Sequence, residues 1–168
     1  RTVEFAEADS KEYLAGLHLG VSTDTQDITG NIVAESAALP DEAALREAIG
    51  RFIGDIEQIP PMYSAIKIGG KKLYELARRG ESVERAPRKI TVSAIDIASR
   101  DGDDYILNIS CSKGTYVRTL CSDIGEALSC GACMSSLRRT RAGVFSVDYA
   151  HSLADIEAAV REGRLSDI

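Results

Sequence analysis

One stretch, from Cys111 to Ala132, constrains the fold most because its pattern changes from that of a strand to that of a helix. Residues 106–111 alternate between two sets of side chains, which predicts a β-strand over 104–111. Lys113-Gly114 interrupts this alternation, and apolar residues then recur at helical spacing. We therefore expect a short loop followed by a helix over residues 115–128, capped by the hydroxyl of Thr115.

The predicted junction between strand and helix carries two cations and an aromatic ring. These are Lys113, Tyr116 and Arg118. The first backbone N–H groups of a helix lack partners, and the helix dipole adds partial positive charge there. The junction is therefore suited to hold an anion beside a ring. It also fits an ordinary surface junction with solvated charges, and spacing alone does not separate these two interpretations.

The charges of the chain are segregated along its length. The formal net charge of the 168 residues is −6, a total that argues against a nucleic-acid partner. However, residues 61–90 contain 8 Lys/Arg and 3 Asp/Glu, while the flanking thirds are acidic. This basic segment, residues 61–90, is a candidate phosphate-binding surface in an otherwise acidic chain.

Within the basic segment, residues 67–80 form the expected contact element. Gly69-Gly70 predicts a turn, and Lys71 and Lys72 open a short helix that ends near Arg78. Cations are unfavourable at the positive end of a helix, so the two lysines there indicate an external polyanion.

The rest of the chain alternates between strand and helix patterns. Both faces of the segment 11–21 are mostly apolar, which is typical of a central strand. Asp41 is a good helix cap, and the helix that it starts is expected to end at Gly54. Further strands are predicted at 31–34, 90–99 and 144–148, a hairpin turn at 101–104, and a last helix after Ser152.

Four cysteines raise the possibility of zinc or redox chemistry. Cys130 and Cys133 have the C-x-x-C spacing of a zinc half-site or a redox motif. Cys111 and Cys121 fall on a predicted strand end and a buried helix face, so we favour reduced thiols in a cytoplasmic protein, with no metal site. His18 and His151 lack ligand-like spacing and are interpreted as structural, and no stretch resembles a membrane span.

Several separate short segments of the sequence resemble motifs of the TruB-type pseudouridine synthases, and they occur in the same order as in that family. Two of them are similar to the bacterial branch of that family rather than to its RNA-guided archaeal and eukaryotic relatives. The match covers nearly the whole chain. These segments are residues 11–30, 58–65 (Gln-Ile-Pro-Pro-Met-Tyr-Ser-Ala), 70–74, 113–120 (Lys-Gly-Thr-Tyr-Val-Arg-Thr-Leu), 123–125 and 137–140.

The resemblance implies an enzyme that isomerises a T-loop uridine of tRNA (position 55) to pseudouridine without a cofactor. It implies an α+β fold with a mixed, largely antiparallel sheet and covering helices, in which residues 11–21 and 104–111 are interior strands. The expected partner is the T arm of tRNA, and the protein is expected to be a cytoplasmic monomer. Lys67, Lys71, Lys72 and Arg78 would then contact RNA phosphates.

The resemblance also assigns roles to four residues. Tyr13 corresponds to a residue that transfers a proton and packs on the base, and Tyr116 to one that packs on the target uracil. Arg118 corresponds to the arginine that pairs with the nucleophilic aspartate, while Leu137 closes the pocket by apolar contact. These residue types suit a reaction on a base that has been flipped out of RNA.

The nucleophilic aspartate of the family lies in a Gly-x-x-Asp-Pro type of loop, upstream of the segment that contains Tyr13. The sequence contains neither that loop nor the PUA-type RNA-binding domain of the family. Residues 1–168 are therefore expected to be part of one catalytic domain that is incomplete at its N-terminus and inactive alone. The alternatives are a non-catalytic module that binds or folds RNA and, more remotely, the zinc or redox protein.

Overall fold

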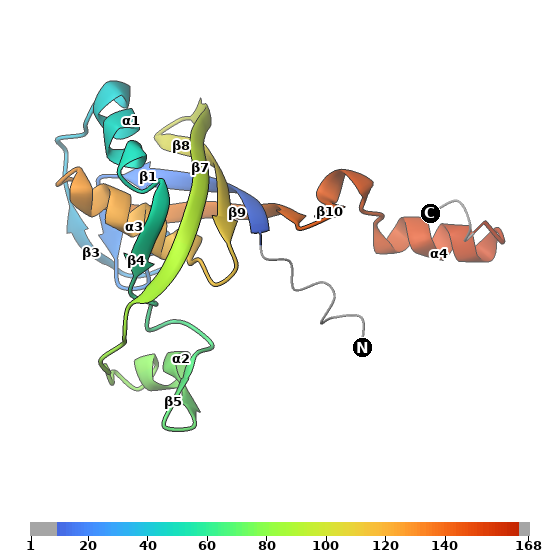
Figure 1. The fold of residues 1–168 in the computed structure, drawn as a ribbon, viewed down its shortest axis with the longest axis horizontal. Helices are drawn as coiled ribbons and strands as arrows, with labels where there is room; N and C mark the ends of the chain where they lie inside the picture. The colour runs from blue at the N-terminus through green and yellow to red at the C-terminus, as the bar shows by residue number, and fades with distance from the viewer. Residues whose placement is uncertain (1–9, 165–168) are drawn as a thin grey trace.

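A six-stranded antiparallel sheet organises the molecule in a computed structural model that describes residues 10–164 (Figure 1). The spatial order is β10-β9-β1-β8-β7-β4, and every neighbouring pair is antiparallel. The α+β, largely antiparallel fold expected from the sequence is thereby confirmed. The strands are β1 (Ser10–Leu19), β4 (Gly54–Gln58), β7 (Arg88–Asp101), β8 (Asp104–Ser112), β9 (Ala132–Ala142) and β10 (Phe145–Ser146).

Four α-helices and two small hairpins complete the described residues. None of the helices within residues 10–164 combines the length and apolar character needed to cross a membrane. The helices are α1 (Glu42–Gly50), α2 (Leu73–Ala77), α3 (Val117–Ala127) and α4 (Leu153–Arg161), with a 3₁₀ turn at Val147–Tyr149. The hairpins pair β2 (Val21–Thr23) with β3 (Ile32–Glu35), and β5 (Lys67–Ile68) with β6 (Lys71–Lys72).

The two predicted interior strands, β1 and β8, lie side by side in the sheet as expected. Their alternation is that of strands with one face in the core: Leu17 of β1 and Leu107 of β8 are fully buried. Helix α3 covers that face with Leu120 and Ile124, which are also fully buried. Removal of these apolar side chains from water is the main force that holds helix and sheet together.

Helix α3 begins two residues later than predicted, and the expected cap is wrong. Tyr116 occupies the cap position, and the hydroxyl of Thr115 donates to the backbone oxygen of Ser112 instead (2.9 Å). The hydroxyl therefore stabilises the loop after β8 rather than the helix. Further along, a Cβ atom added to Gly125 would lie 2.2 Å from the backbone nitrogen of Ala132, so α3 approaches β9 closely only because this residue is glycine.

Three other predicted boundaries were wrong. Asp41 does cap α1 by accepting from the backbone of Ala44 (2.8 Å), but the helix ends at Gly50, and Gly54 begins β4. Residues 71–72 form strand β6 rather than a helical turn, and the strand predicted at 144–148 is reduced to β10 and a 3₁₀ turn.

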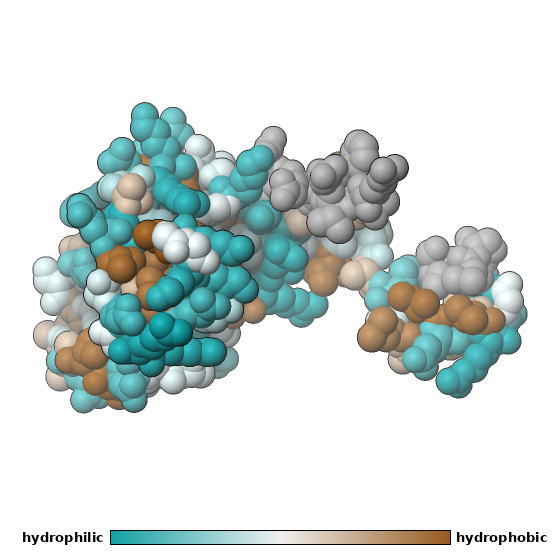
Figure 2. Space-filling view, turned by 90° about the horizontal axis from the view of Figure 1, so that it is seen from below, coloured by the Kyte–Doolittle hydropathy of each residue, from teal (hydrophilic) through white to brown (hydrophobic). Residues whose placement is uncertain are grey.

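The C-terminal helix α4 lies away from the sheet, beyond β10 (Figure 1). Figure 2 shows hydrophobic side chains on the surface of this part of the molecule, and Leu153 is 80% exposed. A capping box between Ser152 and Asp155 starts the helix, as predicted, and stabilises it locally without support from the core.

The strand register brings the motifs to one end of the sheet, which we call the site end. Lys11 at the start of β1 pairs with Cys111 near the end of β8 and with Ala142 at the end of β9. At the same end, Gln58 closes β4 beside Arg88, the first residue of β7. The segment with β5 and α2 projects from this side, between β4 and β7 (Figure 1).

Candidate active site

Tyr13 lies on β1 at the site end, directly opposite Arg139 of β9. Residues opposite each other in an antiparallel pair share a face of the sheet, here the face that packs on α3. Burial of the phenol raises the pKa of Tyr13, and the nearby Cys111 adds to this, while a hydrogen bond and the charge of Arg139 partly oppose it. The Tyr13 hydroxyl is therefore protonated at neutral pH and can both donate and accept a hydrogen bond.

Leu137 lies on the same face of the sheet as Tyr13, because it pairs with Ala15, two residues further along β1. Its side chain is 47% exposed although it is apolar, so it is available for contact with a ligand. The structure thus brings Tyr13, Leu137 and Arg139 together on one face of the sheet. Arg139 was not predicted as a site residue.

Arg118 lies in the first turn of α3 and is anchored to another part of the chain. Its Nη2 donates to the backbone oxygen of Tyr63 (2.7 Å). Its Nε is buried and has no hydrogen-bond partner within residues 10–164. An unsatisfied buried donor is costly, especially on a charged group, so the guanidinium retains capacity for an acceptor such as a carboxylate.

Tyr116 stands between the strand and the helix, two residues before Arg118. Its ring is half-buried, and its backbone is extended, with φ −95° and ψ 98°. The buried side chain of Gln58 holds this backbone by two hydrogen bonds. Sequence reasoning noted Gln58 only as part of a motif and did not assign it a role.

The four predicted RNA-binding cations lie on the segment that projects from the site end. Lys72 Nζ donates to the hydroxyl of Tyr74 (3.2 Å), and this hydrogen bond raises the pKa of Lys72. Lys72 and Arg78 lie 5.3 and 5.4 Å from the centre of the Tyr74 ring, respectively. Lys67 and Lys71 are exposed, and neither forms an ion pair with a carboxylate in residues 10–164.

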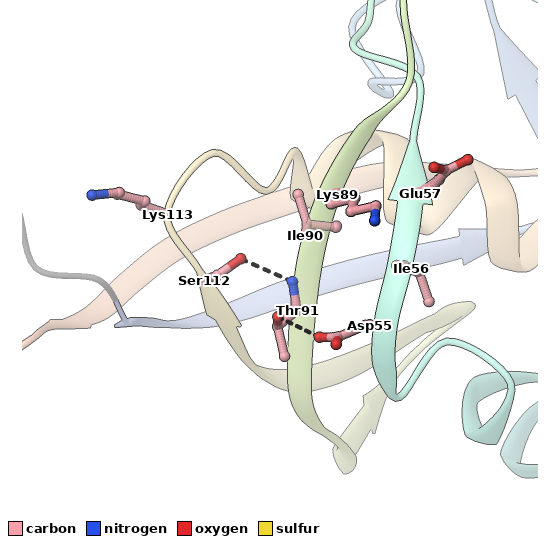
Figure 3. A pocket seen from close by; sticks show the side chains of 8 residues that line it. All are labelled: Asp55, Ile56, Glu57, Lys89, Ile90, Thr91, Ser112 and Lys113. Atoms are coloured by element: carbon pink, nitrogen blue, oxygen red, sulfur yellow. Dashed lines mark hydrogen bonds between the residues drawn. The ribbon is translucent and has the colours of Figure 1, made fainter.

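Two surface hollows lie near the site end. Figure 3 shows one of about 620 Å³ over β4 and β7, where the hydroxyl of Thr91 donates to Asp55 (2.7 Å) and its backbone N–H to Ser112 (2.9 Å). The other, of about 340 Å³, is lined by residues 22–26, 61–63 and part of α3. The second hollow adjoins Tyr63, the residue whose carbonyl binds Arg118.

The cysteines are unsuited to thiolate chemistry in this structure. All four are free and buried. Burial raises the pKa of Cys121 to about 12 and that of Cys133 to about 11, with nearby acidic groups contributing. Both thiols are therefore protonated at neutral pH in this structure, which argues against the redox alternative, because redox chemistry needs a thiolate.

His18 links neighbouring strands through Asp104 and is not placed to activate a serine nucleophile. Its Nδ1 lies 2.6 Å from one oxygen of Asp104, whose other oxygen accepts from the hydroxyl of Ser135 (2.6 Å). Because Asp104 stands between the other two groups, the arrangement ties β1, β8 and β9 together but does not activate the serine. This supports the structural interpretation of His18.

Two family models match the chain from end to end. The model described as "TruB family pseudouridylate synthase (N terminal domain)" matches residues 1–117, and that of the "tRNA pseudouridylate synthase B C-terminal domain" matches residues 118–167. The boundary between them falls at the start of α3. In the structure the sheet continues across it, because β9 pairs with β1.

Curated relatives include tRNA pseudouridine synthase B of Alkaliphilus oremlandii, which is 52% identical over 150 residues, covering 88% of this chain and 50% of that protein. The protein of the same name from Bordetella pertussis is 50% identical over 155 residues, covering 90% of this chain and 63% of the relative. The chain thus spans about half the length of the curated relatives it matches.

Solved structures share the fold. A crystal structure of a Cbf5-Nop10-Gar1 complex matches with a TM-score of 0.70 and 27% identity, over 99% of this chain and 41% of that one. A crystal structure of the archaeal box H/ACA sRNP Nop10-Cbf5 complex matches with a TM-score of 0.65 and 25% identity, over 100% of this chain and 40% of that one.

Proposed function

Because this chain belongs to the TruB family of pseudouridylate synthases, we propose that it forms the substrate pocket of a tRNA pseudouridine synthase acting on the T-loop uridine (position 55). The observation that carries the proposal is Arg118, a guanidinium anchored through Nη2 whose Nε is buried without an acceptor within residues 10–164. Such a group is suited to orient a carboxylate. The relatives' names supply the reaction class.

The residues of the site end divide the work of binding a flipped uracil. The ring of Tyr116 provides a stacking surface, and the exposed side chain of Leu137 closes the pocket by apolar contact. Tyr13 presents a protonated hydroxyl beside Leu137 and Arg139, and this group is suited to hydrogen-bond the base and to take part in proton transfer.

Arg118 would hold the nucleophilic aspartate in its ionised form through charge-assisted hydrogen bonds. No carboxylate in residues 10–164 pairs with Arg118. On the basis of the family resemblance, we propose that the nucleophile comes from a segment outside this chain. The 168 residues alone are then expected to form no pseudouridine.

The T arm of tRNA is the proposed partner of the projecting segment. Lys67, Lys71, Lys72 and Arg78 are grouped there, and none of them forms an ion pair with a carboxylate of the described residues, which favours contact with phosphates. Residues 1–168 act as part of one catalytic domain, a proposal supported by the pairing of β9 with β1 across the family-model boundary. We propose a monomeric enzyme without cofactor.

The test uses an assembled synthase, in which the 168 residues are joined to the parts of the Alkaliphilus oremlandii relative that they do not match. It should convert T-loop uridine in single-turnover assays. Arg118→Ala should lower the rate by about 10²–10³-fold, as loss of a preorganised electrostatic partner does. Arg46→Ala is the matched control, because Arg46 pairs with Glu42 on the exposed face of α1.

Two results would refute this account. Pseudouridine formed by the isolated 168 residues would show that the nucleophile lies within them. Full activity of the Arg118→Ala enzyme would show that Arg118 does not organise the reaction. Tight tRNA binding by an assembled synthase that forms no product would favour the non-catalytic RNA-binding module instead.

A further inference from the structure

Gln58 is a buried amide whose two polar atoms both bind one residue of the site. The side chain is at the end of β4, and the residue is only 1% exposed. Its Nε2 donates to the backbone oxygen of Tyr116 (3.1 Å), and its Oε1 accepts from the backbone N–H of Tyr116 (2.8 Å). An amide in such a place is favourable only when its polar atoms are bonded, as they are here.

The two hydrogen bonds act on Tyr116 as a neighbouring strand would. The Tyr116 backbone is extended, and its oxygen also accepts from Leu120 N–H (3.0 Å), the first backbone bond of the helical turn. The tyrosine side chain makes no capping bond of its own. Gln58 therefore fixes the point where strand geometry becomes helix geometry while the Tyr116 ring stays free to meet a ligand.

The same part of the chain also holds Arg118. Tyr63, five residues after Gln58, accepts from Arg118 Nη2 (2.7 Å), and Pro60 and Pro61 restrict the backbone between them. A further hydrogen bond, from Arg85 Nη1 to the oxygen of Pro60 (3.0 Å), fastens this short segment. Residues 58–63 thus hold both the backbone of Tyr116 and the guanidinium of Arg118.

We infer that Gln58 is a positioning residue: it sets Tyr116 and, through the first turn of α3, Arg118 in the geometry that the reaction requires. The inference rests on the proposed function, which supplies the roles of Tyr116 and Arg118. It concerns a group that does not touch the substrate, so its loss should reduce the rate of the chemical step much more than tRNA affinity.

Gln58→Leu in the assembled synthase removes both hydrogen bonds while keeping a side chain of similar size. We expect the single-turnover rate to fall about 10²-fold, since small displacements of catalytic groups have effects of that order. The dissociation constant for tRNA should change less than about threefold, because phosphate contacts dominate affinity. Leu45→Ala is the control for general destabilisation, because Leu45 is fully buried in α1.

Gln58→Glu gives a readout that a merely space-filling role would not move. A protonated carboxyl has one donor and one acceptor, as the amide does here, whereas a carboxylate cannot donate to the Tyr116 oxygen. Burial raises the pKa of such a carboxyl. The rate relative to the unaltered enzyme should therefore recover as pH falls from about 8 to about 5.5 in Gln58→Glu, but not in Gln58→Leu.

Amide hydrogen exchange in the 168-residue chain tests the hydrogen bonds between Gln58 and Tyr116 without the need for catalysis. The Tyr116 N–H should exchange at least about tenfold faster in Gln58→Leu, while amides in the middle of α3 keep their protection. An unchanged Tyr116 exchange rate, an unchanged turnover rate, or a rate loss equalled by Leu45→Ala would each overturn the inference. Failure of the unaltered assembled synthase to form pseudouridine would refute the proposed function. Amide hydrogen exchange would then remain as the test of whether Gln58 holds the Tyr116 backbone.

Discussion

Asp123 gives the sharpest stability prediction because its carboxyl is held in the middle of α3. Burial raises the pKa of this carboxyl from 3.8 to about 6, and the charge of Glu126 adds to the effect. Between these two values the folded protein keeps a proton that the unfolded chain releases. Raising the pH from about 4 to about 6 should therefore remove the contribution of Asp123 to stability, and this contribution should stay constant above that range.

The size of the effect follows from the difference between the two pKa values. At ~1.36 kcal/mol per pH unit, it would be about 3 kcal/mol for a fully enclosed group. The Asp123 side chain is only half-buried, so solvent screening reduces this to about 1–2 kcal/mol. Asp123→Asn is neutral in both states, so it should stabilise the protein by that amount at pH 7 and hardly at all near pH 3.5.

Urea unfolding of the 168-residue chain at a series of pH values measures this directly. The difference in unfolding free energy between Asp123→Asn and the unaltered chain should grow between pH 4 and 6. Asp96→Asn on the exposed side of β7 is the matched control for replacing a carboxylate with an amide. A difference that is constant with pH, or that shrinks as pH rises, would refute the argument that burial of Asp123 disfavours its charge.

Two further predictions concern the assembled synthase. Replacing Lys71 and Lys72 with Ala should reduce the slope of log affinity for tRNA against log salt concentration by about two, roughly one per lost phosphate contact. The control is the replacement of Arg46 and Arg51 with Ala, at α1 and its C-terminal cap. An unchanged slope would mean that the two lysines only keep the hairpin soluble. Tyr13→Phe keeps the ring and removes the hydroxyl, so the single-turnover rate should fall about 10²–10⁴-fold with little change in tRNA affinity. Nearly full activity of Tyr13→Phe would leave the ring as the part that matters.

The strand and helix around residues 106–128 could be predicted because side-chain periodicity and burial coincide there. In β8 every second residue reaches the core, and in α3 the apolar stripe faces the sheet, so the pattern in the sequence reflects the environment of each residue. The resemblance then supplied Tyr13, Tyr116, Arg118 and Leu137 by motif. Periodicity alone would not have distinguished them from surface residues.

Strand β9 could not be predicted because its second half has no buried face. Residues 137–141 are Leu-Arg-Arg-Thr-Arg and extend past the core, where backbone hydrogen bonds to β1 hold them whatever their side chains are. Recognising this strand would have placed Arg139 on the same face as Leu137 by its two-residue spacing. The role of Gln58 was out of reach for another reason, since its partner is 58 residues away and is a backbone group.

The charged and polar groups at the site end bear on the role that we propose for Tyr13. Arg139 lies opposite Tyr13, Arg118 has a buried donor without a partner among residues 10–164, and burial raises the pKa of the Tyr13 phenol more than Arg139 lowers it. Under the proposed function, we expect donors of this kind to stabilise negative charge on an incoming carboxylate and on the reacting base. The phenol can donate a hydrogen bond and accept one, but its raised pKa makes the phenolate scarce at neutral pH, so a base role for Tyr13 would require that its surroundings change after substrate binding.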